Sequence, residues 1–122
     1  MDTVNFHEYE FACNCCGKNK INDTVILLCQ KIRDALGMPI VITSGYRCEK
    51  HNAEIGGVKG SFHTKGKAAD LFIPAGGSLL FNTIRQLYLA GKVPELGYCI
   101  RYNWGCHIDI VKRKSGRVFE CR

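Results

Sequence analysis

The feature that most restricts the fold is a helical repeat of apolar residues that leads directly into a β-branched run. Within residues 23–36, apolar side chains recur every three or four positions, which is the spacing of one buried helix face. Asn22 or Asp23 can cap the start of this helix, and Gly37 ends it. The β-branched run at residues 40–43 then predicts a buried strand. The chain therefore combines helix and strand at close range.

The remainder of the chain continues this mixture of elements. A short helix is expected over residues 48–55, and a glycine-marked loop runs over residues 56–66. A second strand is expected over residues 68–73, and a second long helix over residues 78–91. In the final third, residues alternate with period two, as they do in the strands of a sheet. The order helix, strand, loop, strand, helix, strand predicts a segregated α+β fold.

The domain organisation is simple, because the 122 residues contain no internal repeat, low-complexity tract or linker. We expect one domain over residues 1–122, with a cysteine-containing N-terminal arm over residues 1–20. No apolar run is long enough for a membrane span. The first residues lack the basic and apolar regions of a signal peptide, so we expect the chain to be made in the cytoplasm. If its target lies outside the membrane, another system must deliver it.

The net charge of +6 is compatible with two kinds of anionic partner. Nucleic acid is one of them, but the basic residues are scattered and form no stripe. An anionic wall polymer is attracted equally well. We therefore do not expect a nucleic-acid partner. We also expect the chain to be a monomer.

Eight cysteines are a large number for a chain without a signal peptide. Cys13, Cys15 and Cys16 form the only cluster along the sequence. Reduced buried thiols, disulfides and a structural zinc site using Cys13, Cys16, Cys48 and one further ligand are all compatible with this pattern. A zinc module that contacts nucleic acid is not expected, because no second close pair follows Cys13-x-x-Cys16.

Two histidines and two carboxylates stand in positions that suggest chemistry. His63 and Asp70 are seven residues apart across a glycine turn, and both residue types are zinc ligands. His107 lies within a period-two segment with Asp109 on the same face, and burying an unpartnered imidazole there would be costly. His107 is either a core histidine bonded to Asp109 or a third ligand. Three ligands would leave a fourth position open for a water activated as a nucleophile.

Taken together, these and neighbouring motifs resemble the M15 family of zinc D-Ala-D-Ala carboxypeptidases and related phage endolysins, which share a metal-site fold with the hedgehog signalling domain. The resemblance spans residues 6–111. The motifs that carry it are Thr43-Ser44-Gly45-Tyr46-Arg47, His51-Asn52, Gly56-Gly57, Ser61-Phe62-His63, Gly66, Ala69-Asp70 and His107-Ile108-Asp109.

The resemblance implies that His63, Asp70 and His107 hold Zn²⁺, which also suits this ligand set best. It further implies a small antiparallel sheet with helices packed on one side. The expected activity is hydrolysis of peptide bonds in peptidoglycan stem peptides, either at the D-Ala-D-Ala terminus or at an internal link. The small size and absent signal peptide favour a phage or prophage lysis protein that acts on the cell wall.

Three further residues receive roles from the resemblance. Arg47 is expected to line the cleft, where its guanidinium would hold a substrate carboxylate or steady the oxyanion. Ser61 is expected to shape the loop or bond to substrate. Asp109 is expected to orient the ring of His107 and raise its basicity.

The general base has no clear candidate in the sequence. Many family members place an acidic residue a few positions before the last histidine, but residues 97–106 contain no carboxylate. Glu95 is far back and would reach the site only if its loop folded over. This absence favours the alternative that the chain is a non-catalytic zinc-containing binding module of the same fold.

Overall fold

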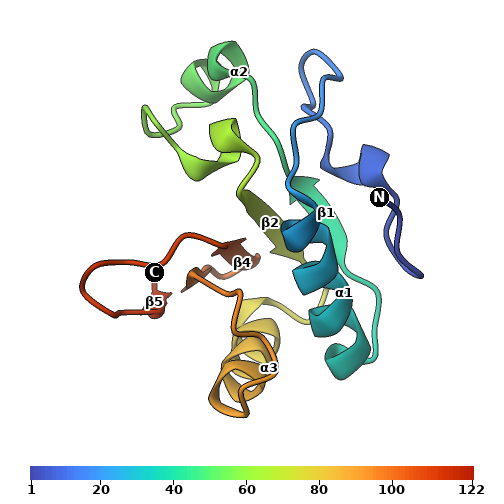
Figure 1. Ribbon diagram of the computed structural model, residues 1–122, viewed down its shortest axis with the longest axis vertical. Coiled ribbons are helices and arrows are strands. Elements are labelled where there is room, and N and C mark those ends of the chain that lie inside the picture. The colour runs from blue at the N-terminus through green and yellow to red at the C-terminus, as the bar shows by residue number, and fades with distance from the viewer.

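The computed structural model describes residues 1–122 and contains three α-helices, two 3₁₀ turns and five strands. Figure 1 shows their arrangement in space. The elements are η1 (Glu8–Phe11), α1 (Asp23–Leu36), β1 (Val41–Ser44), α2 (Glu49–Glu54), η2 (Phe62–Lys65), β2 (Ala68–Phe72), α3 (Gly77–Leu89), β3 (Tyr98–Arg101), β4 (Gly105–Asp109) and β5 (Phe119–Cys121).

The strands form one mixed sheet in the order β1-β2-β4-β3-β5. The first three pairings are antiparallel, whereas β5 lies parallel to β3. The predicted α+β class is confirmed. The expectation of a wholly antiparallel sheet is wrong at one edge, where β5 pairs parallel with β3. β5 gave no signal in the sequence, because it has only three residues, all at least partly exposed, and shows no period-two pattern.

The two long helices share one core with one face of the sheet. α1 contacts α3, and α3 packs on β3 and β4. Side chains from β2, β3 and β4 that point toward the helices are fully buried; they are Ala69, Leu71, Cys99, Cys106 and Ile108. Because successive strand residues point to opposite faces, Asp70, Ile100 and His107 lie on the other face of the sheet. This separation leaves one face for the core and one for chemistry.

The boundaries of α1 agree with the sequence prediction. Asn22 accepts a hydrogen bond from the backbone N–H of Thr24, as an N-cap does. Gly37 ends the helix in the left-handed conformation, with φ of 73°. None of the helices has both the length and the apolar character needed to cross a bilayer.

The N-terminal arm is packed onto the core. Phe6 and Phe11 are almost completely buried. The backbone N–H of Tyr46 donates to the carbonyl of Phe11 over 2.8 Å. A Cβ added to Gly45 would lie 2.5 Å from that same carbonyl oxygen, so only glycine permits this close approach. The arm thereby reaches the segment between β1 and α2, beside which it runs in Figure 1.

Candidate metal centre

The sheet register brings two of the three predicted ligands side by side. Asp70 on β2 is the cross-strand partner of His107 on β4. His63 comes from η2, the turn that leads into β2. Gly66 ends that turn with φ of 69°, and its N–H donates to the His63 carbonyl. The turn thus folds His63 back over the same face of the sheet.

The donor atoms of these residues, here named the His–Asp–His site, lie at distances suited to one ion. Asp70 Oδ1 is 3.3 Å from His63 Nε2 and 3.4 Å from His107 Nδ1. The three donors all lie within 4.8 Å of one another. Tetrahedral zinc with ligands at about 2.0–2.2 Å separates its donors by roughly 3.3–3.6 Å. The geometry and chemistry of the donor set therefore fit a single divalent ion.

Hydrogen bonds on the far side of each ring fix which nitrogen is free to bind a metal. His63 is 3% exposed, and its Nδ1 donates to the Gly45 carbonyl over 2.8 Å. His107 Nε2 donates to Asp109 Oδ2, also over 2.8 Å. These bonds leave the lone pairs of His63 Nε2 and His107 Nδ1 directed at Asp70. Such outer hydrogen bonds are typical of metal-ligating histidines.

Asp109 lies behind His107 and is fully buried. Arg113 forms a two-pronged contact with it, over 3.0 Å and 2.8 Å, and the Val111 N–H adds a third bond. Burial opposes ionisation of Asp109, but the contacts with His107 and Arg113 hold its pKa below the ordinary value. Asp109 therefore stays charged and orients His107, and it does not line the cavity described below.

Arg47 holds the second oxygen of Asp70. Its Nη2 donates to Asp70 Oδ2 over 3.1 Å, while Nη1 donates to Asn52 and Nε to Ser44. Burial opposes ionisation of Asp70, but His107 and His63, when their rings are protonated and donate to it, keep the pKa of this carboxyl well below its ordinary value. A guanidinium has five N–H groups, so Arg47 keeps two that can donate to another group.

Ser61 acts on His63 through the backbone. Its hydroxyl oxygen accepts from the His63 N–H over 3.3 Å and caps η2. The Ser61 carbonyl accepts from the Thr64 hydroxyl, which tightens the same turn. Ser61 also lines the cavity, so both roles expected of it, shaping the loop and facing a ligand, are compatible with its position.

The His–Asp–His site opens into a cavity of about 450 Å³. Arg47 and Arg122 give it cationic groups, and Tyr102 stacks on Trp104 with ring centroids 5.0 Å apart. The lining was not predicted beyond Arg47, Ser61 and the three ligands. Tyr102 and Trp104 stand just before His107 in sequence, and that proximity was the only available signal.

A family model described as Peptidase M15 matches residues 4–109. The chain belongs to the peptidase M15 family. The resemblance seen in the sequence is thereby confirmed, and peptidases of this family depend on a metal. No curated protein matches the chain.

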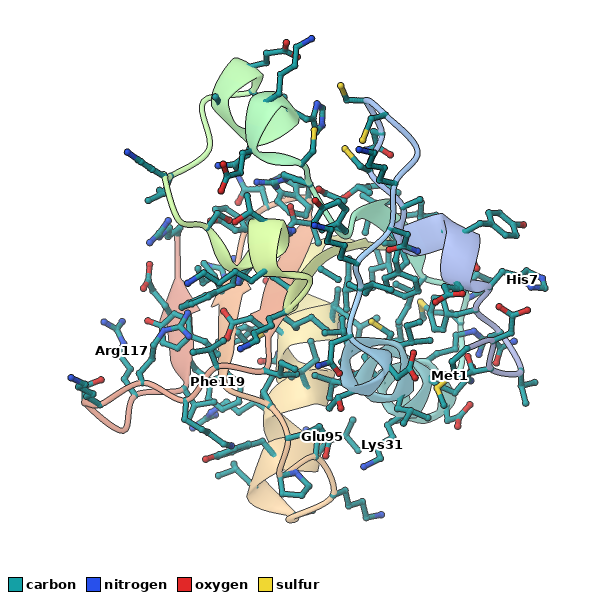
Figure 2. All side chains as sticks on the ribbon, turned by 45° about the horizontal axis from the view of Figure 1, so that its top comes forward. Met1, His7, Lys31, Glu95, Arg117 and Phe119 are labelled. Atoms are coloured by element: carbon teal, nitrogen blue, oxygen red, sulfur yellow. The ribbon has the colours of Figure 1, made fainter.

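In this member of the M15 family, no second carboxylate faces the His–Asp–His site. Asp70 is the only acidic residue that lines the cavity. Glu95 pairs with Lys31 over 3.0 Å instead. Figure 2 shows these two side chains at the opposite end of the view from α2. Glu95 therefore does not fold over the site, and the position of the upstream acid has no acidic occupant.

Proposed function

We propose that this chain is a zinc peptidase that hydrolyses peptide bonds in peptidoglycan stem peptides. The observation that carries the proposal is the convergence of His63 Nε2, Asp70 Oδ1 and His107 Nδ1 at the floor of an open cavity. Two imidazoles and one carboxylate with an open fourth position are typical of catalytic zinc sites. Action on the cell wall, in the manner of a phage or prophage lysis protein, is part of the proposal.

The side chains around the site prepare it for that chemistry. When bound, a zinc ion supplies Lewis-acid polarisation of a carbonyl and lowers the pKa of water. Asp109 and the Gly45 carbonyl hold the two imidazoles in the tautomers that expose one lone pair each. Arg47 holds Asp70 Oδ2, so that Oδ1 is directed at His63 and His107. The site is thus oriented before a ligand arrives.

The cationic lining favours a substrate that carries a carboxylate. Arg47 has two N–H groups free to donate to a carbonyl or carboxylate, and Arg122, which pairs with Glu120, lies at the same cavity. Stem peptides carry carboxylates at their C-terminus and along their length. Tyr102 and Trp104 offer flat apolar surface for the alkyl parts of such a peptide.

A test with purified peptidoglycan and a synthetic stem peptide ending in D-Ala-D-Ala separates the two modes of cleavage. Release of D-alanine identifies a carboxypeptidase, and appearance of new amino groups without free D-alanine identifies an endopeptidase. Either product should require added metal and disappear in His63→Ala. If neither product appears when metal fully occupies the His–Asp–His site, the proposal is overturned.

One observation favours a second candidate function, a non-catalytic binding module of the same fold. The cavity has no acidic residue other than Asp70, which itself belongs to the donor set. A peptidase normally needs a group that accepts a proton from water. Binding of the metal-loaded protein to peptidoglycan without any product would support this alternative.

A further inference from the structure

Three thiols from two distant parts of the chain meet away from the His–Asp–His site. Cys13 and Cys16 belong to the N-terminal arm, and Cys48 directly precedes α2. Their sulfur atoms all lie within 4.8 Å of one another. Figure 2 shows sulfur atoms gathered between the N-terminal loop and α2. We name these three residues the cysteine cluster.

The arm is folded so that two of these thiols face the same point. The Gly17 N–H donates to the Cys13 carbonyl over 2.9 Å, and the Cys13 N–H donates to the Lys18 carbonyl over 2.8 Å. Gly17 has φ of 74°, a left-handed conformation that glycine adopts without strain. A Cys-x-x-Cys pair closed by a glycine turn presents both sulfurs on one side of the loop, as metal-binding turns require.

Backbone N–H groups are directed at the sulfurs. The Cys48 N–H donates to Cys13 Sγ over 3.4 Å, and the His51 N–H donates to Cys48 Sγ over 3.4 Å. Burial opposes ionisation of the Cys13 thiol, which is 3% exposed. The two N–H groups that point at Cys13 Sγ and Cys48 Sγ offset this cost for these two sulfurs. The thiolate is the metal-binding form of cysteine, and N–H donors of this kind stabilise it.

We propose that the cysteine cluster binds a structural zinc ion through the thiolates of Cys13, Cys16 and Cys48, with a fourth donor from Cys15 or His51. Zinc–sulfur bonds of about 2.3 Å place tetrahedral sulfurs roughly 3.8 Å apart, within the separation found here. Each thiol that binds the ion releases its proton to solvent. No electron transfer is involved.

Cys15 and His51 are the two side chains proposed as fourth donor. Each lies within three residues of a cluster cysteine along the chain. Donor atoms of Cys15, His51 and Glu54 also lie within 4.8 Å of one another. His51 follows Cys48 with the spacing that relates Cys16 to Cys13. Cys48 and His51 therefore form a second close pair of potential ligands. The positions of the cysteines alone do not reveal this pair, because one of its members is a histidine.

A metal at this position would fasten the arm to the segment that carries Arg47. The Tyr46 N–H already donates to the Phe11 carbonyl, two residues before Cys13. Cys48 directly follows Arg47, which holds Asp70. Closing the loop from Cys13 to Cys48 would restrict the unfolded chain and stabilise this junction.

Cobalt substitution tests the proposal separately from the peptidase site. Cobalt(II) held by thiolates gives sulfur-to-metal charge-transfer absorption in the near ultraviolet, and imidazole and carboxylate ligands do not. We expect this absorption in the reduced full-length protein loaded with Co²⁺. It should persist in His63→Ala, which disables the other site, and be lost in Cys16→Ser. Cys121→Ser, which removes an exposed thiol on β5, is the matched control and should leave it unchanged.

The fourth donor is resolved by two further variants. In the His63→Ala background, where only the cysteine cluster holds cobalt, a change in the tetrahedral visible bands in either Cys15→Ser or His51→Ala assigns that residue. Retention of these bands in both variants would overturn the four-ligand site.

Two outcomes on folded protein also overturn the site, so the test does not depend on Cys16→Ser being stable. One is absence of sulfur charge transfer in the reduced wild-type protein. The other is disulfide bonding among Cys13, Cys16 and Cys48 in freshly purified protein, detected by mass spectrometry after alkylation. Metal analysis of His63→Ala provides an independent check, because one zinc ion per chain should remain.

Discussion

The His–Asp–His site and the cysteine cluster are both convergent groups of metal-binding side chains, but they are built in different ways. Two members of the first site lie on paired strands, Asp70 opposite His107, and each donor is held by a further hydrogen bond or ion pair. The cysteine cluster stands on an N-terminal turn and on the residue before a six-residue helix. One site is placed by sheet register and the other by local turns.

The two groups also differ in how open their surroundings are. The His–Asp–His site opens into a cavity of about 450 Å³, and its three donors leave a fourth position. The cysteine cluster lines none of the cavities and has further donors beside it. An open site with imidazole and carboxylate ligands suits catalysis, whereas a closed thiolate site suits structure. The difference shows that one small chain can place an open and a closed set of potential metal donors by different structural means.

The largest expected effect is on activity, from removing one ligand of the open site. His63→Ala should lower peptide hydrolysis by about a thousandfold or more, because metal assistance is worth several kcal/mol and each 1.36 kcal/mol is a factor of ten. Hydrolysis of a stem peptide measures it. His7→Ala is the matched control, since His7 is exposed and stacks on Tyr9. Full activity in His63→Ala would show that the His–Asp–His site is not the catalytic site.

The next largest effect is on folding stability. It is measured at one glycine turn in each region, Gly66 beside His63 and Gly17 in the N-terminal arm. Gly66→Ala should lower the free energy of unfolding by about 3 kcal/mol, through left-handed strain and displacement of a neighbour. The added Cβ would lie 1.9 Å from the Lys20 carbonyl oxygen. Gly17→Ala should cost only about 1 kcal/mol, because no atom lies within 4 Å of its Cβ position.

Urea unfolding with unchanged m-values measures both glycine variants. Equal losses would show that the contact between the His63 turn and the N-terminal arm does not matter. Such a result would remove one of the differences between the two regions.

A smaller effect concerns the group behind His107. Asp109→Asn should weaken metal binding at the His–Asp–His site by about 10- to 100-fold, because the ring loses its charged partner. Arg113→Gln leaves the His107–Asp109 hydrogen bond in place and should weaken metal binding less. Competition with a chromogenic chelator gives both affinities. Identical affinities in Asp109→Asn and the unmodified chain would mean that Asp109 has no part in holding the ligand.

The smallest expected effect concerns substrate binding by the cavity lining. Arg122→Gln should raise KM for a peptide with a free carboxylate by no more than about fivefold, since an exposed ion pair contributes up to about 1 kcal/mol. The turnover number should not change. Arg117→Gln is the control, because this arginine does not line the cavity. A loss of turnover instead of affinity would assign Arg122 a direct part in catalysis.

The sequence predicts those parts of the fold that depend on local chemistry. The cap at Asn22 and the stop at Gly37 are local signals, and α1 has the predicted bounds. The period-two pattern around His107 correctly places Asp109 on the same face of β4. These features follow from interactions between residues close in the chain.

Features that depend on distant pairing are not visible in the sequence. β5 reaches β3 only after the chain crosses from β4, and it carries Arg122 to the cavity. The sequence left Cys13, Cys16 and Cys48 as one of three alternatives for the cysteines, and only the packing of the arm beside the segment before α2 brings Cys48 to Cys13. The His63–Asp70–His107 set was predicted through family resemblance, since spacing alone could not show that the donors meet.

The most direct test of the central claim is anomalous diffraction at the zinc edge from crystals of the zinc-loaded protein. We expect a peak about 2.0–2.2 Å from His63 Nε2, Asp70 Oδ1 and His107 Nδ1, with an open side toward the cavity. Zinc bound elsewhere, with none between these three donors, would contradict it.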